Sequence, residues 1–261
     1  MYTLGIDIGS TTSKCAVIKD GKELVAHSLQ TGGLGTGGPE EAMAQLWQSC
    51  GLTRQDMACA FVTGYGRKNY EGADGEISEL TAHALGGRFV FPDLRTVIDI
   101  GGQDAKVIAL SPSGKMVNFV MNDKCAAGTG RFFEAMAKAF EMDLTEFSNL
   151  SLQAKNVIPI TAQCTVFAES EVISLVGEGK PMDEIAAGIE LSVAKRCFVM
   201  AKKAGAVDKI TLTGGCAKNE GLKQAIQKVL KLKVIDLPVD PQLIGAIGAA
   251  EFARQKGLAQ G

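Results

Sequence analysis

The chain has 261 residues, a net charge of −2 at pH 7 and 46% hydrophobic residues. This length and composition suit one large domain or two medium ones, each with its own core. The near-neutral charge leaves no basic excess for wrapping a nucleic acid. No apolar run approaches the roughly 18 to 20 residues that a membrane span needs. We therefore expect a cytoplasmic protein with neither nucleic acid nor membrane as a partner.

The first ninety residues alternate strand and helix patterns. Strands are predicted over 4–8, 13–18, 23–30 and 58–63, and helices over 40–50 and 76–86. The turn Asp20-Gly21 joins the second and third strands as a hairpin. This alternation is typical of an α/β fold.

At Thr96 the N-terminal pattern begins again. Ile6-Asp7-Ile8-Gly9 followed by Lys14 recurs as Ile98-Asp99-Ile100-Gly101 followed by Lys106, at a constant offset of 92 residues. A repeat that occurs only twice predicts two similar domains facing each other. We predict domains at 1–95 and 96–261.

The second repeat carries an insertion and a closing helix. Strands are predicted over 157–161, 209–213 and 233–237, and helices over 182–203, 220–230 and 242–255. The last helix is rich in glycine and alanine, which lets it approach its neighbours closely. We expect it to pack back toward the domain interface.

Two turns carry residue types that suit a nucleotide phosphate. They are Asp7 with Gly9, Ser10, Thr11, Thr12, Ser13 and Lys14, and Asp99 with Gly101, Gly102, Gln103, Asp104 and Lys106. Backbone N–H groups, hydroxyls and an ammonium group can bind phosphate, whereas the acid would hold Mg²⁺ through water. One such turn is equally consistent with a plain hairpin. Two such turns, one on each related domain, favour the binding of one polyphosphate and one metal ion from both sides.

Seven cysteines are present, and no two are spaced as C-x-x-C. An odd number without close pairs argues against a disulfide framework and a single-chain zinc ribbon. Four of them fall within strand or helix patterns and are interpreted as small buried hydrophobic residues, namely Cys15, Cys50, Cys59 and Cys197.

Cys125 and Cys164 lie at different kinds of position. Cys125 precedes the small-residue turn Ala126 to Gly130, which leads into a helix pattern. Cys164 lies where another helix pattern starts. A thiolate at such a place is favoured by the positive end of the helix and the unpaired N–H groups of its first turn.

These motifs together resemble a known family. The two phosphate turns and Leu212-Thr213-Gly214-Gly215 resemble the fold shared by actin, the 70-kDa heat-shock chaperones and the sugar kinases. Within it, the motifs Met121 to Arg131 and Cys164 to Glu171 resemble the activator component of the 2-hydroxyacyl-CoA dehydratases, which is related to the ATPase subunits of benzoyl-CoA reductase. The resemblance covers residues 3 to 253 approximately. It implies two duplicated actin-like, ribonuclease H-like α/β domains with a nucleotide cleft between them.

The resemblance also implies a nucleotide site. ATP or ADP with Mg²⁺ would lie between the domains, with the phosphates on the two turns and the adenosine near Gly214 and Gly215. Asn219 and Gln242 would lie near the base or ribose. The residues that would border the nucleotide from the cysteine-bearing turn are Ala127, Gly128, Thr129 and Gly130. The candidates for a direct part in hydrolysis are Asp7, Asp99 and Gln103.

The two cysteines are too few for an iron–sulfur cubane, which usually takes four thiolates. A C₂ homodimer would supply four, two from each chain, around one [4Fe-4S] cluster, and the family is known for this arrangement. Zinc bound by four thiolates stays open as an alternative. So does a plain ATPase with two buried thiols.

The function that follows is an ATP-driven, oxygen-sensitive one-electron donor of anaerobic amino-acid fermentation. It would take an electron from ferredoxin or flavodoxin and pass it to a 2-hydroxyacyl-CoA dehydratase or a double-cubane-type reductase. One alternative is a small-molecule kinase of the sugar-kinase type, with Asp99 or Asp104 as the base. Another is a redox-inactive, nucleotide-gated binding protein. The sequence does not identify the acyl-CoA on which the partner acts.

Overall fold

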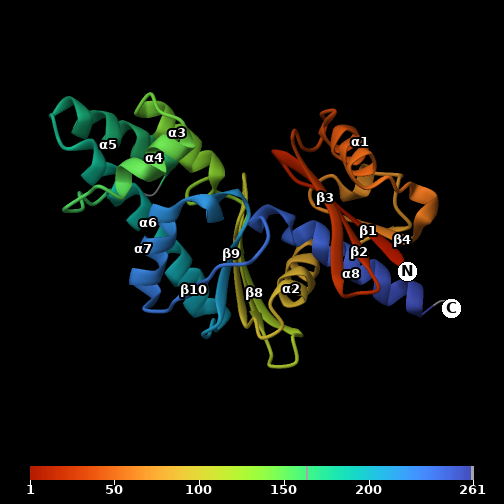
Figure 1. Cartoon of the computed structure of the whole chain (residues 1–261). Helices are drawn as coiled ribbons and strands as arrows, with labels where there is room; N and C mark the ends of the chain where they lie inside the picture. The colour runs from red at the N-terminus through yellow and green to blue at the C-terminus, as the bar shows by residue number, and fades with distance from the viewer. Residues whose placement is uncertain (163, 260–261) are drawn as a thin grey trace. The chain divides into compact units, whose positions relative to one another are not determined.

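The computed structural model describes residues 1–162 and 164–259, and the chain forms two compact units. Unit 1 contains Met1–Leu94, the segment Leu110–Met116 and the chain from Leu237 on, and unit 2 contains Arg95–Ala109 and Val117–Asp236. Each is built on a five-stranded mixed sheet with helices packed beside it (Figure 1). None of the described helices combines the length and apolar character that a membrane crossing requires.

The sheet of unit 1 has the strand order β3-β2-β1-β4-β5, with β1 antiparallel to β2 and parallel to β4. Its strands are β1 Tyr2–Ile8, β2 Thr12–Lys19, β3 Glu23–Thr31, β4 Met57–Thr63 and β5 Gly75–Glu76. Its helices are α1 Gly38–Cys50, α2 Glu79–Val90 and α8 Ile244–Leu258, with short 3₁₀ turns η1 Arg54–Asp56, η2 Arg67–Asn69 and η4 Pro241–Leu243. Nearly every residue of β1 and β2 is buried, including the polar residues Asp7, Ser13 and Lys14 at the ends that meet in the turn.

Helix α8 packs against β1, β4 and α2, all within unit 1 (Figure 1). The sequence assigned this helix to the second domain, 96–261, and the structure differs because glycines allow very close backbone approach. A Cβ atom at Gly5 would lie 1.9 Å from the Ala246 carbonyl oxygen, and one at Gly248 would lie 1.7 Å from the Ala82 carbonyl oxygen. The expected packing of α8 toward a domain interface stays a prediction.

Gly5→Ala is therefore expected to lower the free energy of unfolding by about 3 kcal/mol, because the added methyl overlaps the α8 backbone and forces it away from β1. Urea unfolding measures the loss. Gly37→Ala is the control, since a Cβ there meets only Glu41 Oε1, at 3.7 Å. Equal unfolding midpoints for the two variants would contradict the close approach of α8 and β1.

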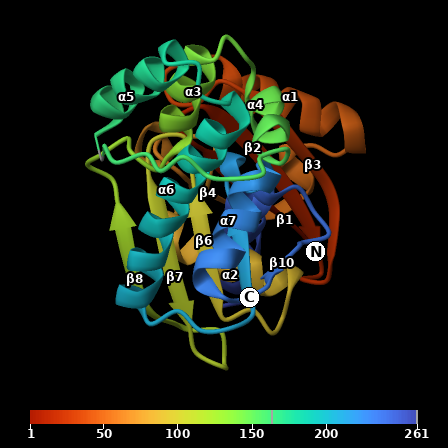
Figure 2. The same ribbon diagram turned by 90° about the vertical axis from the view of Figure 1, so that its left-hand side faces the viewer.

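The sheet of unit 2 has the order β10-β9-β6-β7-β8, and α6 and α7 run alongside its strands (Figure 2). Its strands are β6 Thr96–Ile100, β7 Ala105–Leu110, β8 Met116–Asn122, β9 Ile210–Thr213 and β10 Val234–Ile235. Its helices are α3 Gly130–Ala139, α4 Leu144–Ser151, α5 Thr165–Gly177, α6 Met182–Ala204 and α7 Glu220–Leu230, with a 3₁₀ turn, η3, at Gly215–Lys218. The main core of this unit joins β6 and β7 to α3 through α7.

Two predicted elements differ from the structure. The segment 157–161, predicted as a strand, belongs to neither sheet. It lies against α6, where the Ile158 N–H donates to the Glu184 carbonyl at 3.1 Å and Gly188 leaves room for the Ile158 carbonyl. The helix predicted over 76–86 begins later, at Glu79, because the Ser78 hydroxyl accepts from the Thr81 N–H and caps the helix there.

Candidate functional site

The first phosphate turn connects β1 and β2. The Gly9 N–H donates to the Thr12 carbonyl at 3.0 Å and closes the turn. The glycine-rich loop behind it braces this turn, because the Gly32 N–H donates to the Thr11 carbonyl at 2.8 Å and the Leu34 N–H donates to the Gly9 carbonyl at 3.0 Å. The Ser13 hydroxyl also donates to the Gly32 carbonyl at 2.8 Å, so backbone and side-chain bonds together hold the turn in shape.

The second phosphate turn connects β6 and β7 in the same way. The Gly101 N–H donates to the Asp104 carbonyl at 2.9 Å, in the position equivalent to the first turn. Register repeats as well: Asp7 lies opposite Lys14, and Asp99 lies opposite Lys106. The structure thus confirms the internal repeat read from the offset of 92 residues.

Both lysines point at the acids of their own turn. Lys14 Nζ lies 3.3 Å from Asp7 Oδ2. Lys106 Nζ lies 3.0 Å from Asp99 Oδ2 and 2.8 Å from Asp104 Oδ2, and the side chains of all three are at most 4% exposed. Each lysine thus pairs with a buried carboxylate beside its turn, and the predicted contact of Lys14 with phosphate stays a prediction.

A third turn is also repeated. The sequence motif of the family indicates this turn only in the second half of the chain. Thr63 ends β4 opposite Asp7, and Thr213 ends β9 opposite Asp99, and each threonine is followed by a glycine. A Cβ on Gly64 or Gly214 would lie 2.3 or 2.4 Å from the carbonyl oxygen of the residue after the acid, and φ is positive at both glycines. Thr213 Oγ1 donates to Asp99 Oδ1 at 2.8 Å. Thr63 lies 56 residues after Asp7 and Thr213 lies 114 residues after Asp99, so the spacing does not reveal this repeat, whereas the shared Thr-Gly pair does.

The start of α3 is bonded to the second phosphate turn. The Gly130 N–H donates to the Gly101 carbonyl at 2.8 Å, and the Arg131 N–H donates to the Gly102 carbonyl at 2.9 Å. The sequence predicts that these N–H groups, in the first turn of the helix, stabilise a Cys125 thiolate. They do not stabilise a Cys125 thiolate, because α3 begins five residues after Cys125 and its first N–H groups already have acceptors.

The turn between Cys125 and α3 is packed into unit 2. Ala127 and Thr129 are fully buried, and Thr129 Oγ1 donates to the Ala126 carbonyl at 2.7 Å. Gly128 has φ of 88°, and a Cβ there would lie 3.2 Å from Arg196 Cδ on α6. Of the four residues expected to border a nucleotide, Gly130 is bonded to the second phosphate turn, through its N–H group to the Gly101 carbonyl.

Of the seven cysteines, all within the described part of the chain, two are exposed: Cys125 and Cys164. They precede α3 and α5, which pack against each other in unit 2 (Figure 1). Cys164 is the N-cap residue of α5, which has no side-chain cap in the described structure, so its first-turn N–H groups favour a negative charge there.

Other cysteines have the opposite environment. Burial raises the pKa of Cys15, Cys197 and Cys216 to about 12, so these three stay protonated near neutral pH. Cys59 is also buried, and Cys50 is half-buried and donates to the Leu46 carbonyl. No group of three or more His, Cys, Asp or Glu side chains in the described residues is arranged to hold a metal ion. Two exposed thiols per chain fit half of a four-thiolate cluster site.

The chain is similar to proteins of a known ATPase family. Residues 4–253 match the model of the BadF/BadG/BcrA/BcrD ATPase family. The chain belongs to this family. It is 48% identical over 253 residues to a 2-hydroxyisocaproyl-CoA dehydratase activator of Clostridioides difficile, covering 97% of this chain and 95% of the relative. It is 46% identical to an (R)-2-hydroxyglutaryl-CoA dehydratase activating ATPase of Acidaminococcus fermentans, covering 98% of both.

Among solved structures, the activator of the 2-hydroxyisocaproyl-CoA dehydratase from Clostridium difficile with bound ADPNP superimposes with a TM-score of 0.95 at 46% identity. The match covers 100% of this chain and 97% of that chain. The predicted fold class, two-domain actin-like α/β, is confirmed. The predicted family is confirmed as well.

Two residues expected near adenosine take part in local structure of this ATPase. Asn219 is the N-cap of α7, where its Oδ1 accepts from the Leu222 N–H at 2.8 Å and from Ser148 Oγ at 3.1 Å. Gln242 lies in η4 of unit 1, where its N–H donates to Asp240 Oδ1 at 2.9 Å. Their contacts with a nucleotide stay predictions.

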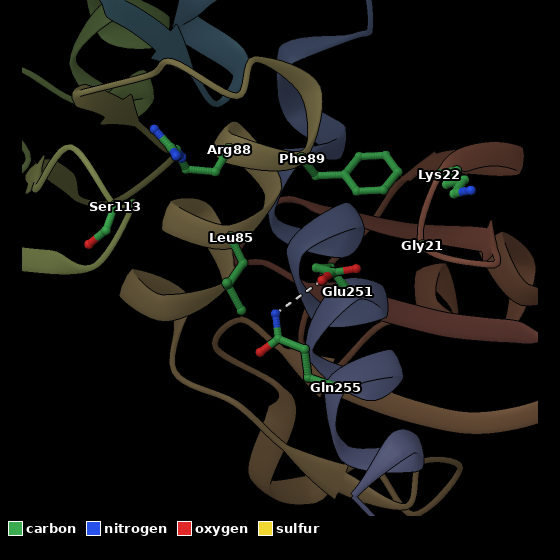
Figure 3. Close-up of a pocket in the computed structure, with 9 residues that line it drawn as sticks. Gly21, Lys22, Leu85, Arg88, Phe89, Ser113, Glu251 and Gln255 are labelled. Carbon is green, nitrogen blue, oxygen red and sulfur yellow. Dashed lines mark hydrogen bonds between the residues drawn. The ribbon is translucent and has the colours of Figure 1, made fainter.

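A separate groove of about 370 Å³ lies in unit 1, at the hairpin end of the strands rather than at the phosphate turns. Figure 3 shows Ser113 and Lys22 at its two ends, with Arg88, Phe89, Leu85 and the Glu251–Gln255 pair between them. None of the residues predicted to bind nucleotide or cluster lines this groove. The family site and this groove are therefore distinct features of the fold.

Proposed function

We propose that this ATPase is a one-electron donor that activates a 2-hydroxyacyl-CoA dehydratase or a double-cubane-type reductase. The observation that carries the proposal is the pair of exposed cysteines, Cys125 and Cys164, ahead of two packed helices in a chain of this family. Relatives with nearly equal identity to this chain are named as activators for different acyl-CoA dehydratases. Identity therefore supports the partner class but does not select its substrate.

The cluster would be held by a homodimer. Each chain offers two thiolates, and a two-fold axis beside Cys125 and Cys164 gives the four that one [4Fe-4S] cluster takes. The outer face of α5 supports such an axis, because it is uncharged. Its exposed residues are Val166, Phe167, Ser170, Ile173, Ser174 and Gly177. The cluster would accept one electron at a time from ferredoxin or flavodoxin and release it to the dehydratase component.

The two phosphate turns would hold ATP or ADP, and Asp7 and Asp99 would hold Mg²⁺ through water. Bound Mg²⁺ supplies charge stabilisation for phosphoryl transfer to water. Gln103, which is exposed at the second turn, would orient the attacking water. Gly214, Gly215, Asn219 and Gln242 would surround the adenosine.

The bonds between α3 and the second phosphate turn support a route from nucleotide to cluster. The Gly101 and Gly102 carbonyls accept from the first two N–H groups of α3, and Cys125 lies on the loop that enters α3. A phosphate-dependent shift of the turn would therefore displace this loop. Such a shift changes the cluster only to the extent that ATP binds the two arrangements with different affinity.

The proposal is tested by activation of a dehydratase. The protein, purified without oxygen and reduced, is mixed with ATP, Mg²⁺ and purified 2-hydroxyacyl-CoA dehydratase, and acyl-CoA dehydration is followed. We expect activity that requires both ATP and the reductant, is lost with ADPNP in place of ATP, and is destroyed by air. Phosphorylation of a sugar by the same preparation, without iron, would support the kinase alternative instead.

A further inference from the structure

A buried polar cluster joins α4, α6 and α7 in unit 2, below the turn expected to carry adenosine. Its centre is Glu190 on α6, which is 2% exposed. Glu190 has no ion-pair partner among the described residues, and its Oε1 has no hydrogen-bond partner there. Such a carboxyl group is costly to bury in its charged form.

Gly221, in the first turn of α7, makes room for this carboxyl group. A Cβ there would lie 2.2 Å from Glu190 Oε2, 2.6 Å from Glu190 Oε1 and 2.2 Å from Ser151 Oγ. Ser151 ends α4, and its hydroxyl donates its hydrogen to the Ser148 carbonyl at 2.8 Å. A hydrogen bond between Ser151 and Glu190 is therefore best made by a proton on Glu190.

The cluster reaches Asn219 directly. Ser148 Oγ donates to Asn219 Oδ1, the same oxygen that caps α7, and Asn219 is also hydrogen-bonded to Glu190. Asn219 ends the turn that begins at Gly214, through its N–H bond to the Cys216 carbonyl at 3.1 Å. A change in the hydrogen bonds of the cluster therefore affects the position of this turn through Asn219.

Several charged groups on the packed elements have partners other than Glu190. Glu146 of α4 accepts from the Asp143 N–H, Glu220 of α7 pairs with Lys223, and Lys223 pairs with Asp236. On α6 itself, Glu184 accepts from Asn156. The pKa of Glu190 is set by its burial and by hydrogen bonds to Ser151 and Asn219, and no charged group among the described residues contributes to its shift.

We propose that Glu190 is a positioning residue for Asn219 and the adenosine turn, and that nucleotide binds more tightly when Glu190 carries a proton. This rests on the proposed nucleotide site. Burial raises the pKa of Glu190 from 4.5 to about 7. The buried Glu190 carboxyl group therefore stays protonated between pH 4.5 and about pH 7. It loses the proton as the pH rises through about 7, and nucleotide affinity falls over the same range.

The experiment is ADP binding by calorimetry between pH 6 and pH 8 on the full chain. We expect the wild-type dissociation constant to rise roughly five- to tenfold across this range. Glu190→Gln, which is neutral and keeps a donor, is expected to bind at pH 8 as the wild type does at pH 6. Glu178→Gln, an exposed residue after α5, is the control and should follow the wild type.

Ser148→Ala gives an independent check, because it removes only the bond from α4 to Asn219. It is expected to weaken ADP at every pH without moving the midpoint. A wild-type affinity that is constant from pH 6 to pH 8, or the same pH profile in Glu190→Gln, would overturn the role of Glu190 alone. A wild type that binds no ADP at any pH would contradict the nucleotide site as well.

Discussion

Replacing either Cys125 or Cys164 with alanine is expected to abolish cluster binding, taking iron from about four atoms per two chains to almost none. Each alanine variant would remove two of the four thiolates of a shared site, because a two-fold axis doubles every substitution. Two thiolates do not hold a cubane. The measurement is iron and acid-labile sulfide per chain after purification without oxygen, together with the mass of the assembly.

Cys50→Ala is the matched control. Cys50 is half-buried at the end of α1, in the other unit, and its thiol donates to Leu46. Its loss should leave iron unchanged. Four irons in each single chain, or unchanged iron in either cluster variant, would contradict a bridged cluster. Zinc without sulfide would show that the four thiolates form a different metal site.

The rate of ATP hydrolysis in the same variants distinguishes the ATPase role of the protein from its electron-transfer role. The phosphate turns lie at strand ends and do not use either cysteine for their backbone bonds. Cys164→Ala is therefore expected to keep ATP hydrolysis while it loses electron transfer to the dehydratase. Joint loss of both would indicate that the cysteine holds the fold rather than a cluster.

The strands and phosphate turns could be predicted from the sequence because their information is local. Asp7, Gly9 and Lys14 recur as Asp99, Gly101 and Lys106, and apolar residues such as Leu4 and Ile6 of β1 and the run Cys15 to Ile18 of β2 mark the two strands. The residue types of a turn and the apolar pattern of a buried strand can both be recognised within ten residues of sequence. The structure reproduces both as matching registers and closing bonds.

Contacts between distant segments could not be read in this way. The segment 157–161 has the apolar pattern of a strand, yet it lies on α6 because Gly188 opens a place for it. Helix α8 joins unit 1 because Gly5 and Gly248 remove the side chains that would keep it away. In both cases a glycine far along the chain decides the packing, and one sequence alone does not reveal which pairs meet.

The candidate site was predicted in part for the same reason. Exposure of Cys125 and Cys164 agrees with their place before helices, whereas the bonds from α3 to Gly101 and Gly102 join residues about thirty positions apart. Glu190 gave no signal, since a glutamate in a long helix reads as a solvated residue. Its burial follows only from how α4 and α7 pack on α6.

Asp99→Asn is expected to reduce ATP hydrolysis roughly 100-fold or more, because it removes the charge that would hold Mg²⁺ at the second turn. The shape of the site should survive, since asparagine can still accept from Thr213 Oγ1, which lies 2.8 Å from Asp99 Oδ1. Lys106 would keep its ion pair with Asp104 at 2.8 Å. Initial rates of phosphate release at several Mg²⁺ concentrations measure the effect.

Thr213→Val separates charge from positioning, because it removes only the hydroxyl that orients Asp99. We expect a smaller loss, roughly tenfold, with an unchanged dependence on Mg²⁺. For Asp99→Asn the requirement for Mg²⁺ should rise, while ADP binding without metal stays close to the wild type. If Asp99→Asn hydrolyses ATP at the wild-type rate, Asp99 does not hold the metal, and Asp7 on the first turn becomes the residue to test, because the repeat gives it the same lysine partner and the same position at a strand end.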